Sequence, residues 1–266
     1  MSNLEIRHEG HVSHVTLNRP ALRNAFDAET IFELTQAFRD ITTMPHVRAV
    51  VLGAHGTAFS AGADLNWMRA MADYTWADNH TDAARLANML WTIASCPVPV
   101  VARVQGDCYG GGVGLVACCD VVVASEEAGF CFSEARLGLI PATISPYVIH
   151  AIGERAARRY FVTAERFDAR HAQLIGLVHE VCAAGALDET TDQVVHSIVR
   201  NGPVAVRACK ELVKDIGKLP IGPDLRDLTA RRIADVRASD EGREGLRAFL
   251  TRTPPAWQMD HKPGEA

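Results

Sequence analysis

A single carboxylate stands in an otherwise apolar stretch of the sequence. Glu134 lies in FCFSEARLGLIPATISPY, residues 130–147, among phenylalanines, leucines and small residues. Two interpretations are open: Glu134 either caps the turn at 136–141 and faces solvent, or it transfers protons from a buried position. Burial disfavours the charged form of a carboxylate and raises its pKa, which suits a group that takes a proton and returns it.

Two glycine-containing loops precede Glu134, and each follows an expected strand and leads into an expected helix. They are GTAFSAGADL (56–65) and GDCYGGGVGLVACCD (106–120). Small residues let a backbone approach a ligand closely, and the first N–H groups of a helix are unpaired and lie at the positive end of its dipole. Neither loop has the spacing of a dinucleotide-binding or P-loop motif. The loops therefore favour a pair of N–H donors that converge on an oxygen which becomes negative.

The elements that must position these loops alternate between strand and helix as far as about residue 125, which predicts an α/β fold. Beyond residue 145 the pattern is mostly helical, with one late strand in LVHEVCA. The expected strands lie in LEIRHEG with a turn at Gly10, HVSHVTLNRP, VRAVVLGAHG, VPVVARVQG and DVVVAS. The expected helices lie in DAETIFELTQAFRDITTM with Asp27 as N-cap, DLNWMRAMAD with Asp64 as N-cap, NHTDAARLANMLWTIASC, GGVGLVACC, and three segments after residue 200.

Composition limits the class of protein. The 266 residues, 48% of them hydrophobic, predict one large domain with a buried core and a smaller C-terminal region. A net charge of -5 gives no reason to expect nucleic acid or an anionic membrane as partner, and ERAARR (154–159) favours a helix face over RNA binding. With no run of eighteen apolar residues and no secretory signal, a cytoplasmic location is expected. Seven cysteines without a CxxC pair indicate reduced, buried thiols rather than a metal site.

Three motifs together carry a family resemblance. FSAGADL, GDCYGGGVGLVACCDVVVAS and FSEARLGLIP, in this order and spacing, resemble the enoyl-CoA hydratase/isomerase (crotonase) superfamily, from VTLNRPALRNAF to EGLRAFL. The resemblance implies a ββα superhelix, or spiral, as the core in residues 1–200. It implies a C-terminal helical trimerisation region in residues 201–266 that covers the CoA site or a neighbouring subunit. An acyl-CoA thioester substrate, a homotrimer or dimer of trimers, and no metal or other cofactor are also implied.

The resemblance further implies a role for individual residues. The thioester carbonyl is expected between the N–H groups of Ala63 and Gly111, with Glu134 as the catalytic carboxylate. The residues expected to bind the CoA part of the substrate are Arg23, Asn24, Ala25, Ala61, Asp64, Leu65, Gly110 and Phe249. Hydratases of this family usually carry a second glutamate three residues past the middle glycine, and here that position is Gly114.

One carboxylate leaves more than one reaction open. It can move a proton from Cα to Cγ, which is isomerisation, or activate water at Cβ and pass the proton to Cα, which is hydration. A finer resemblance, to the bacterial branch that hydrates methylglutaconyl-CoA, favours hydration of a branched glutaconyl thioester, with Arg69 or Arg136 near the second carboxylate of the substrate. The alternatives are a Δ3-Δ2-enoyl-CoA isomerase, another single-glutamate acyl-CoA chemistry, or a non-catalytic acyl-CoA-binding or RNA-binding protein.

Overall fold

A six-stranded sheet forms the centre of the molecule. The computed structural model describes residues 2–259. The strand order is β1-β2-β3-β5-β7-β10, with β1 and β2 antiparallel and the remaining neighbours parallel. The bounds are β1 (Leu4–Glu9), β2 (Val12–Leu17), β3 (Ala49–Ala54), β5 (Val100–Val104), β7 (Val121–Ser125) and β10 (Glu180–Cys182). The predicted hairpin, its turn at Gly10 and the central strands are all present.

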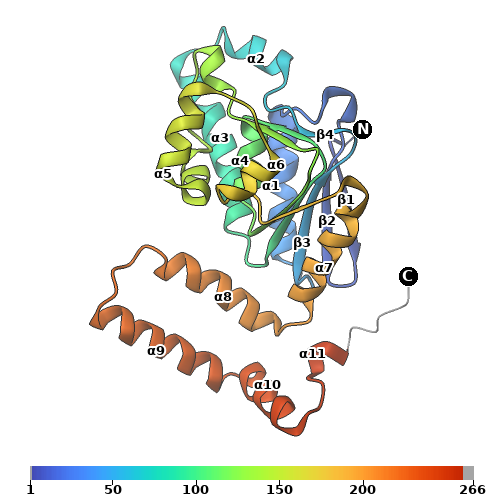
Figure 1. Cartoon of the computed structure of the whole chain (residues 1–266), viewed down its shortest axis with the longest axis vertical. Helices are drawn as coiled ribbons and strands as arrows, with labels where there is room; N and C mark the ends of the chain where they lie inside the picture. The colour runs from blue at the N-terminus through green and yellow to red at the C-terminus, as the bar shows by residue number, and fades with distance from the viewer. Residues whose placement is uncertain (1, 260–266) are drawn as a thin grey trace.

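Helices cover both faces of this sheet, which explains why β3 is buried along its whole length. In β2 the alternation read from the sequence holds, since Ser13, Val15 and Leu17 are buried and the residues between them are half-buried. One face belongs to the main core cluster, which includes apolar residues of the helices α1 (Ala28–Thr42), α3 (Trp76–Ala94) and α4 (Gly111–Ala117) (Figure 1). The other face packs against α7 (Leu187–Val199), where Leu187 and Val195 are buried.

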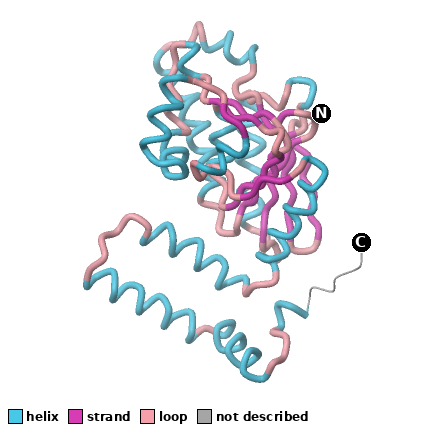
Figure 2. The backbone as a smooth tube through the Cα atoms, in the orientation of Figure 1, coloured by secondary structure: helices cyan, strands magenta, loops and turns pink. Residues whose placement is uncertain are grey.

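A second, smaller sheet runs beside the first (Figure 2). Its order is β4-β6-β8-β9, with bounds β4 (Ala58–Ser60), β6 (Asp107–Tyr109), β8 (Gly129–Cys131) and β9 (Phe167–Asp168). Each of β4, β6 and β8 follows a strand of the large sheet and leads directly into one of the three segments of the expected site. The sequence analysis did not predict these strands, because two or three residues are too few to show a period of two.

The helices of the core are α1 (Ala28–Thr42), α2 (Leu65–Met71), α3 (Trp76–Ala94), α4 (Gly111–Ala117), α5 (Ser145–Thr163), α6 (Ala169–Leu174) and α7 (Leu187–Val199), with short 3-10 helices η1 (Pro20–Leu22), η2 (Glu134–Leu137) and η3 (Ala184–Ala186). Helices α1 to α4 follow the predicted segments, and α5, α6 and α7 lie in the part beyond residue 145 that was predicted only as mostly helical. Asp27 and Asp64 are N-caps, as predicted. Helix α3 begins before the predicted segment, because Thr75 and Asp78 form a capping box ahead of it.

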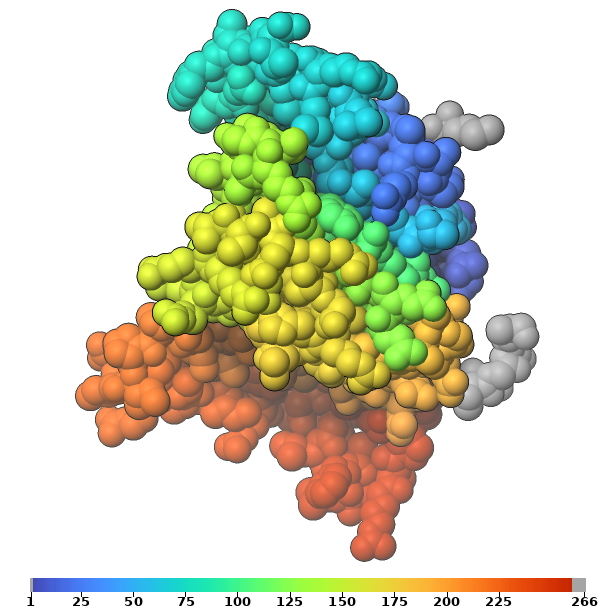
Figure 3. Space-filling view, turned by 45° about the horizontal axis from the view of Figure 1, so that its top comes forward, coloured from blue at the N-terminus to red at the C-terminus, as the bar shows by residue number. Residues whose placement is uncertain are grey.

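The last helices form what we call the C-terminal arm, which lies at the opposite end of the molecule from α2 (Figures 1 and 3). It comprises α8 (Pro203–Ile216), α9 (Pro223–Ala238), α10 (Asp240–Thr251) and α11 (Ala256–Met259). An ion pair from Lys210 to Asp120 (2.6 Å) ties α8 to the core, and Asp120 also accepts from the Val100 N–H (2.7 Å). None of the described helices is long and apolar enough to cross a membrane.

Candidate active site

A short parallel bridge between Phe26 and Ala63 holds the first loop. The Phe26 N–H donates to the Gly62 carbonyl (2.7 Å), and the Asp64 N–H donates to the Phe26 carbonyl (2.7 Å). Neighbouring amides of an extended chain point to opposite sides, so the Ala63 N–H faces away from Phe26. Among residues 2–259 this N–H has no hydrogen-bond acceptor. It is therefore free to bind a group brought to the loop.

The second loop meets the first at its glycines. Gly110 adopts φ +49° and ψ −118°, a conformation that a residue with a side chain rarely takes, and Gly111 begins α4. A Cβ atom placed on Gly62 would lie 3.0 Å from the Tyr109 carbonyl oxygen and 3.9 Å from the Gly110 Cα. As the first N–H of α4, that of Gly111 has no acceptor in the described part of the chain. Two unpaired amides thus lie on loops that touch.

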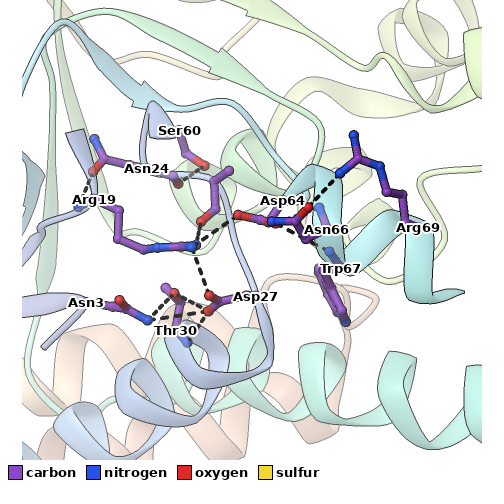
Figure 4. Close-up of polar contacts among 11 residues, drawn as sticks. Asn3, Arg19, Asn24, Asp27, Thr30, Ser60, Asp64, Asn66, Trp67 and Arg69 are labelled. Atoms are coloured by element: carbon purple, nitrogen blue, oxygen red, sulfur yellow. Dashed lines mark hydrogen bonds and ion pairs between the residues drawn. The ribbon is translucent and has the colours of Figure 1, made fainter. Parts of the chain in front are cut away.

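Arg19 connects the end of the first loop, at Asp64, to the segment that precedes α1 (Figure 4). Its guanidinium contacts the carboxylates of Asp27 (3.0 Å) and Asp64 (3.1 Å) and donates to the Ala25 carbonyl (2.6 Å). Burial alone raises the pKa of Asp64, but N–H donors of α2 and the Arg19 guanidinium outweigh it and hold that pKa below its usual value. Arg19 was not among the residues predicted from the sequence. The sequence offered one sign of its role: Arg19 stands directly before Pro20, after a predicted strand and ahead of the two predicted N-caps, Asp27 and Asp64.

Asn24 fixes the same loop from inside. Its side chain is buried, accepts from the Arg19 N–H (2.9 Å) and donates to the carbonyls of His55 (2.8 Å) and Ala58 (2.9 Å). Both Arg23 and Asn24 have positive φ angles, which turn the chain sharply before Ala25. The polar atoms of Asn24 are therefore engaged within the protein, and this side chain builds the loop that was expected to bind CoA.

Glu134 begins η2 with its carboxylate turned inward. A Cβ atom on Gly110 would lie 3.1 Å from the Glu134 Oε1, so the carboxylate rests against the second loop. Oε2 is buried and has no hydrogen-bond partner among the described residues. Burial raises the pKa of Glu134, and a hydrogen bond from its own backbone N–H partly offsets that rise. The interpretation of Glu134 as a cap that faces solvent is therefore wrong.

The other residues named from the sequence divide into two groups. Ala61 lies in the first loop and donates its N–H to the Arg23 carbonyl (2.9 Å), while Leu65 begins α2 and is 70% exposed. The Arg23 guanidinium is exposed and pairs with Asp107 (3.1 Å). Phe249 is 81% exposed on α10, at the far end of the molecule from α2 (Figure 1). The structure thus gathers all the predicted CoA-binding residues except Phe249.

The two arginines considered for a second substrate carboxylate are both engaged. Arg136 donates to the Ala164 carbonyl at the end of α5 (2.5 Å). Arg69 lies on the exposed side of α2 and donates to the Asn66 side chain (2.7 Å), as Figure 4 shows. Neither contact is to the carboxylate of Glu134 or to the two glycine loops.

This arrangement suits one kind of chemistry. Two backbone donors on touching loops can bind one oxygen and stabilise negative charge that develops on it. A buried carboxylate with a raised pKa beside them can accept a proton and release it at a neighbouring atom. Together they suit reactions that pass through an enolate of a carbonyl compound.

Comparison with known proteins gives the same result. A family model described as enoyl-CoA hydratase/isomerase matches residues 7–260. A crystal structure of an enoyl-CoA hydratase from Shewanella pealeana superposes with a TM-score of 0.93 at 40% identity and covers 96% of each chain. The 2,3-dehydroadipyl-CoA hydratase of Escherichia coli K12 is 31% identical over 96% of this chain and 98% of its own length. The carnitinyl-CoA dehydratase of Citrobacter koseri is 29% identical over 96% and 98%.

These matches confirm the resemblance and the fold that was predicted from it. The names of the relatives share hydration or dehydration of a CoA thioester but differ in the acyl group. The acyl group and the closest branch therefore stay predictions.

Proposed function

The chain belongs to the enoyl-CoA hydratase/isomerase family, and on this premise we propose that Glu134 adds water across the 2,3 double bond of an enoyl-CoA thioester. Enzymes of this family act on acyl-CoA thioesters. Relatives of this chain are named as hydratases, which are enzymes of the lyase class. One observation carries the proposal. Oε2 of the Glu134 carboxylate is buried without a hydrogen-bond partner among the described residues, and Oε1 lies against Gly110, where two loops present unpaired amides.

In the proposed reaction the thioester oxygen accepts hydrogen bonds from the N–H groups of Ala63 and Gly111. Glu134 takes a proton from water as the water oxygen bonds to Cβ, and the C2–C3 π electrons move to give an enolate. Glu134 then returns the proton to Cα, which restores the thioester carbonyl and the carboxylate and leaves a 3-hydroxyacyl-CoA. Each backbone donor that binds the enolate oxygen is expected to contribute about 3 kcal/mol to the transition state.

The raised pKa of Glu134 fits this role, because the same group must act first as a base and then as an acid. The CoA part of the substrate is proposed to lie along the first loop and the adjacent segment from Arg23 to Ala25, where Arg23 and Leu65 are exposed, Ala61 is half-buried and Ala25 is buried beneath them. The buried side chains of Asn24 and Asp64 then act by holding that surface in shape.

For the acyl group we propose a branched glutaconyl thioester such as methylglutaconyl-CoA. The support is the similarity of the segments around Ala63, Gly114 and Glu134 to the bacterial branch with that activity. The relative named 2,3-dehydroadipyl-CoA hydratase also takes an acyl chain that ends in a second carboxylate. Arg69 is the better-placed candidate for that carboxylate, since Arg136 is directed to the end of α5.

A second candidate reaction is Δ3-Δ2 isomerisation, and the observation that favours it is Gly114. With glycine at that position, α4 contributes no carboxylate to the site, and one carboxylate suffices to move a proton from Cα to Cγ. Turnover of 2-enoyl, 3-enoyl, methylglutaconyl and dimethylacrylyl thioesters separates the two reactions. Hydration removes the 2,3 double bond and leaves no double bond in its place, whereas isomerisation only moves it between the 2,3 and 3,4 positions.

The test of the function is Glu134→Gln, which keeps the shape of the side chain and removes its basicity. We expect kcat to fall by about 10⁴-fold, the upper range for loss of general acid–base catalysis. CoA binding, measured by calorimetry, should be retained. The control is Glu127→Gln, an exposed glutamate in the turn after β7. Equal turnover by the wild type and Glu134→Gln contradicts the proposal, and a wild type that binds CoA but turns over no thioester favours the binding protein.

The C-terminal arm is proposed to pack on a neighbouring subunit in a homotrimer or dimer of trimers. Its exposed apolar side chains include Ile221 (99%), Phe249 (81%) and Leu250 (77%). Exposed apolar groups gathered on one segment are typical of an interface. Light scattering should give a mass of three or six chains, and Ile221→Asp should shift it towards one.

A further inference from the structure

Ile144 fills the space beside Gly114. A Cβ atom built on Gly114 would lie 2.2 Å from the Ile144 Cγ2 and 2.8 Å from its Cβ, whereas the next neighbour, Leu90, stands at 3.7 Å. Non-bonded carbon atoms do not approach one another to less than about 3 Å, so even an alanine at position 114 requires Ile144 to move. Ile144 is 1% exposed and caps the start of α5, which limits how far it can shift.

The filled space lies beside the reactive carboxylate. The Gly114 N–H donates to the Gly110 carbonyl (3.3 Å), so Gly114 lies one hydrogen-bonded turn after the N-cap of α4. The Glu134 carboxylate rests against Gly110, and Ile144 rests against Gly114. Glu134 and Ile144 therefore contact the first turn of α4 at two positions that are one hydrogen bond apart.

We propose that Ile144 determines the chemistry of the site by closing the position from which a second carboxylate on α4 would reach the substrate. Hydrocarbon then occupies that position, and Glu134 is the carboxylate that both activates the water and protonates Cα. The chemical part of this inference rests on the proposed hydration, whereas the steric part rests on the packing of Gly114 and Ile144 alone. Ile144 acts through the shape of the site and is a specificity-determining residue.

The steric part is tested by thermal unfolding without substrate. Gly114→Ala in the wild type should lower Tm by about 5 °C, the size typical of overpacking a buried site. In an Ile144→Gly background the same substitution should raise Tm, because the obstruction is gone and alanine favours the helix over glycine. Glycine is well tolerated at an N-cap. Ile144→Val is the matched control: it retains both γ carbons, so the loss on adding Gly114→Ala should persist.

The chemical part is tested by Gly114→Glu combined with Ile144→Gly. In this double variant a second carboxylate can occupy the vacated space, and the pH profile of kcat for an enoyl-CoA should gain a second ionisation. Its activity should also survive Glu134→Gln better than that of the wild type, by about tenfold or more. Gly114→Glu alone, with Ile144 in place, should show the lower Tm and no new ionisation.

The outcomes separate this inference from the proposed function. An unchanged Tm for Gly114→Ala, or an equal loss with glycine and valine at position 144, overturns the steric part whether or not any thioester is turned over. A folded double variant with the pH profile of the wild type overturns the chemical part, since a carboxylate at 114 then does not face the substrate. A wild type without turnover on any thioester counts against the hydratase and leaves the Tm comparison to decide the packing.

Discussion

The loops around Glu134 and the C-terminal arm are stabilised in different ways. The site is built from three consecutive strand–strand–helix segments. Contacts within the same chain hold its first loop, among them the ion pair of Arg19 with Asp64 and the hydrogen bond from Asn24 to the His55 carbonyl. In contrast, α8 and α9 have no fully buried residue, and the arm exposes Ile221 and Phe249. The placement of the two unpaired amides is therefore a property of the single chain, whereas the arm presents an exposed apolar surface of the kind found at interfaces.

After Glu134→Gln, the largest expected effect comes from removing one amide of the site. Ala63→Pro deletes the Ala63 N–H, which has no acceptor among the described residues, so folding loses no hydrogen bond. If this amide binds the enolate oxygen, kcat/KM for an enoyl-CoA should fall by about 10² to 10³-fold. Steady-state kinetics measures the loss, and urea unfolding measures how far the fixed φ of proline changes stability.

Ala63→Ser is the control for this prediction, because serine changes the side chain but keeps the N–H. It should retain activity within about threefold. Similar activity of the proline and serine variants would show that the Ala63 amide does not bind the reacting oxygen. The loops around Glu134 would then differ from the C-terminal arm in packing but not in a catalytic role for this amide.

The next effect is on the stability of the core. Arg19→Ala leaves the nearly buried Asp64 without its cation and frees the Ala25 carbonyl. Breaking a pair of this kind by removing one partner costs about 3 kcal/mol. Urea unfolding should show this loss. Arg23→Ala, which breaks a contact to Asp107 of the same 3.1 Å length but at an exposed guanidinium, should cost less than about 1 kcal/mol.

The lowered pKa of Asp64 gives the Arg19 prediction a pH dependence. A carboxylate with a depressed folded pKa contributes stability above its unfolded pKa, here near 3.8, and that stability is lost as pH falls through the folded value. The difference between wild type and Arg19→Ala should therefore shrink in acid below about pH 4. A difference that is constant with pH would indicate lost packing rather than lost charge pairing.

The same two regions explain what the sequence could predict. Asp27 and Asp64 were identified as caps because the signal is local: an acid just before a helical pattern. The strands β1, β2, β3, β5 and β7 of the large sheet were identified because apolar alternation or runs extend over five or six residues. The three site segments were found through motif resemblance, and the structure supplied the reason that they meet, which is the small sheet.

Other features depend on contacts distant in sequence and have no local pattern. Arg19 meets Asp64 across 45 positions, and nothing in NRP alone indicates that pairing. Ile144 meets Gly114 across thirty positions, and the sequence only showed that an acid was missing from α4. For Phe249 the expected partner is another chain, so neither the sequence nor a single subunit can supply the contact.

A smaller effect is expected from the arm. Phe249→Ala should raise KM for the enoyl-CoA by about tenfold with kcat nearly unchanged, because contact with the CoA part is made equally in the ground and transition states. Steady-state kinetics gives the split. Leu250→Ala, at the adjacent and similarly exposed position, is the control and should leave KM unchanged. Unchanged KM in both variants would remove the arm from the CoA site and leave it a role in assembly alone.

The smallest expected effect is on the stability of Glu134→Gln. This variant should lose activity but gain thermal stability at neutral to alkaline pH. The folded pKa of Glu134 is raised above its ordinary value of 4.5 by burial, so its contribution to stability is complete below that value and is lost as pH rises through the folded pKa. Glu134→Gln cannot ionise and escapes this loss. Its Tm should therefore exceed that of the wild type at about pH 8 and approach it at about pH 4.

Thermal unfolding across this pH range measures the difference, and Glu127→Gln controls for removal of one negative charge from a chain of net charge -5. A higher Tm for Glu134→Gln alone would mean that the fold tolerates an unfavourable carboxylate where the reaction needs one, which is typical of a catalytic position. A lower Tm at about pH 8 would mean that the folded chain stabilises the charged form of Glu134. The raised pKa, and with it the physical basis for a carboxylate that both takes and returns the proton, would then be wrong.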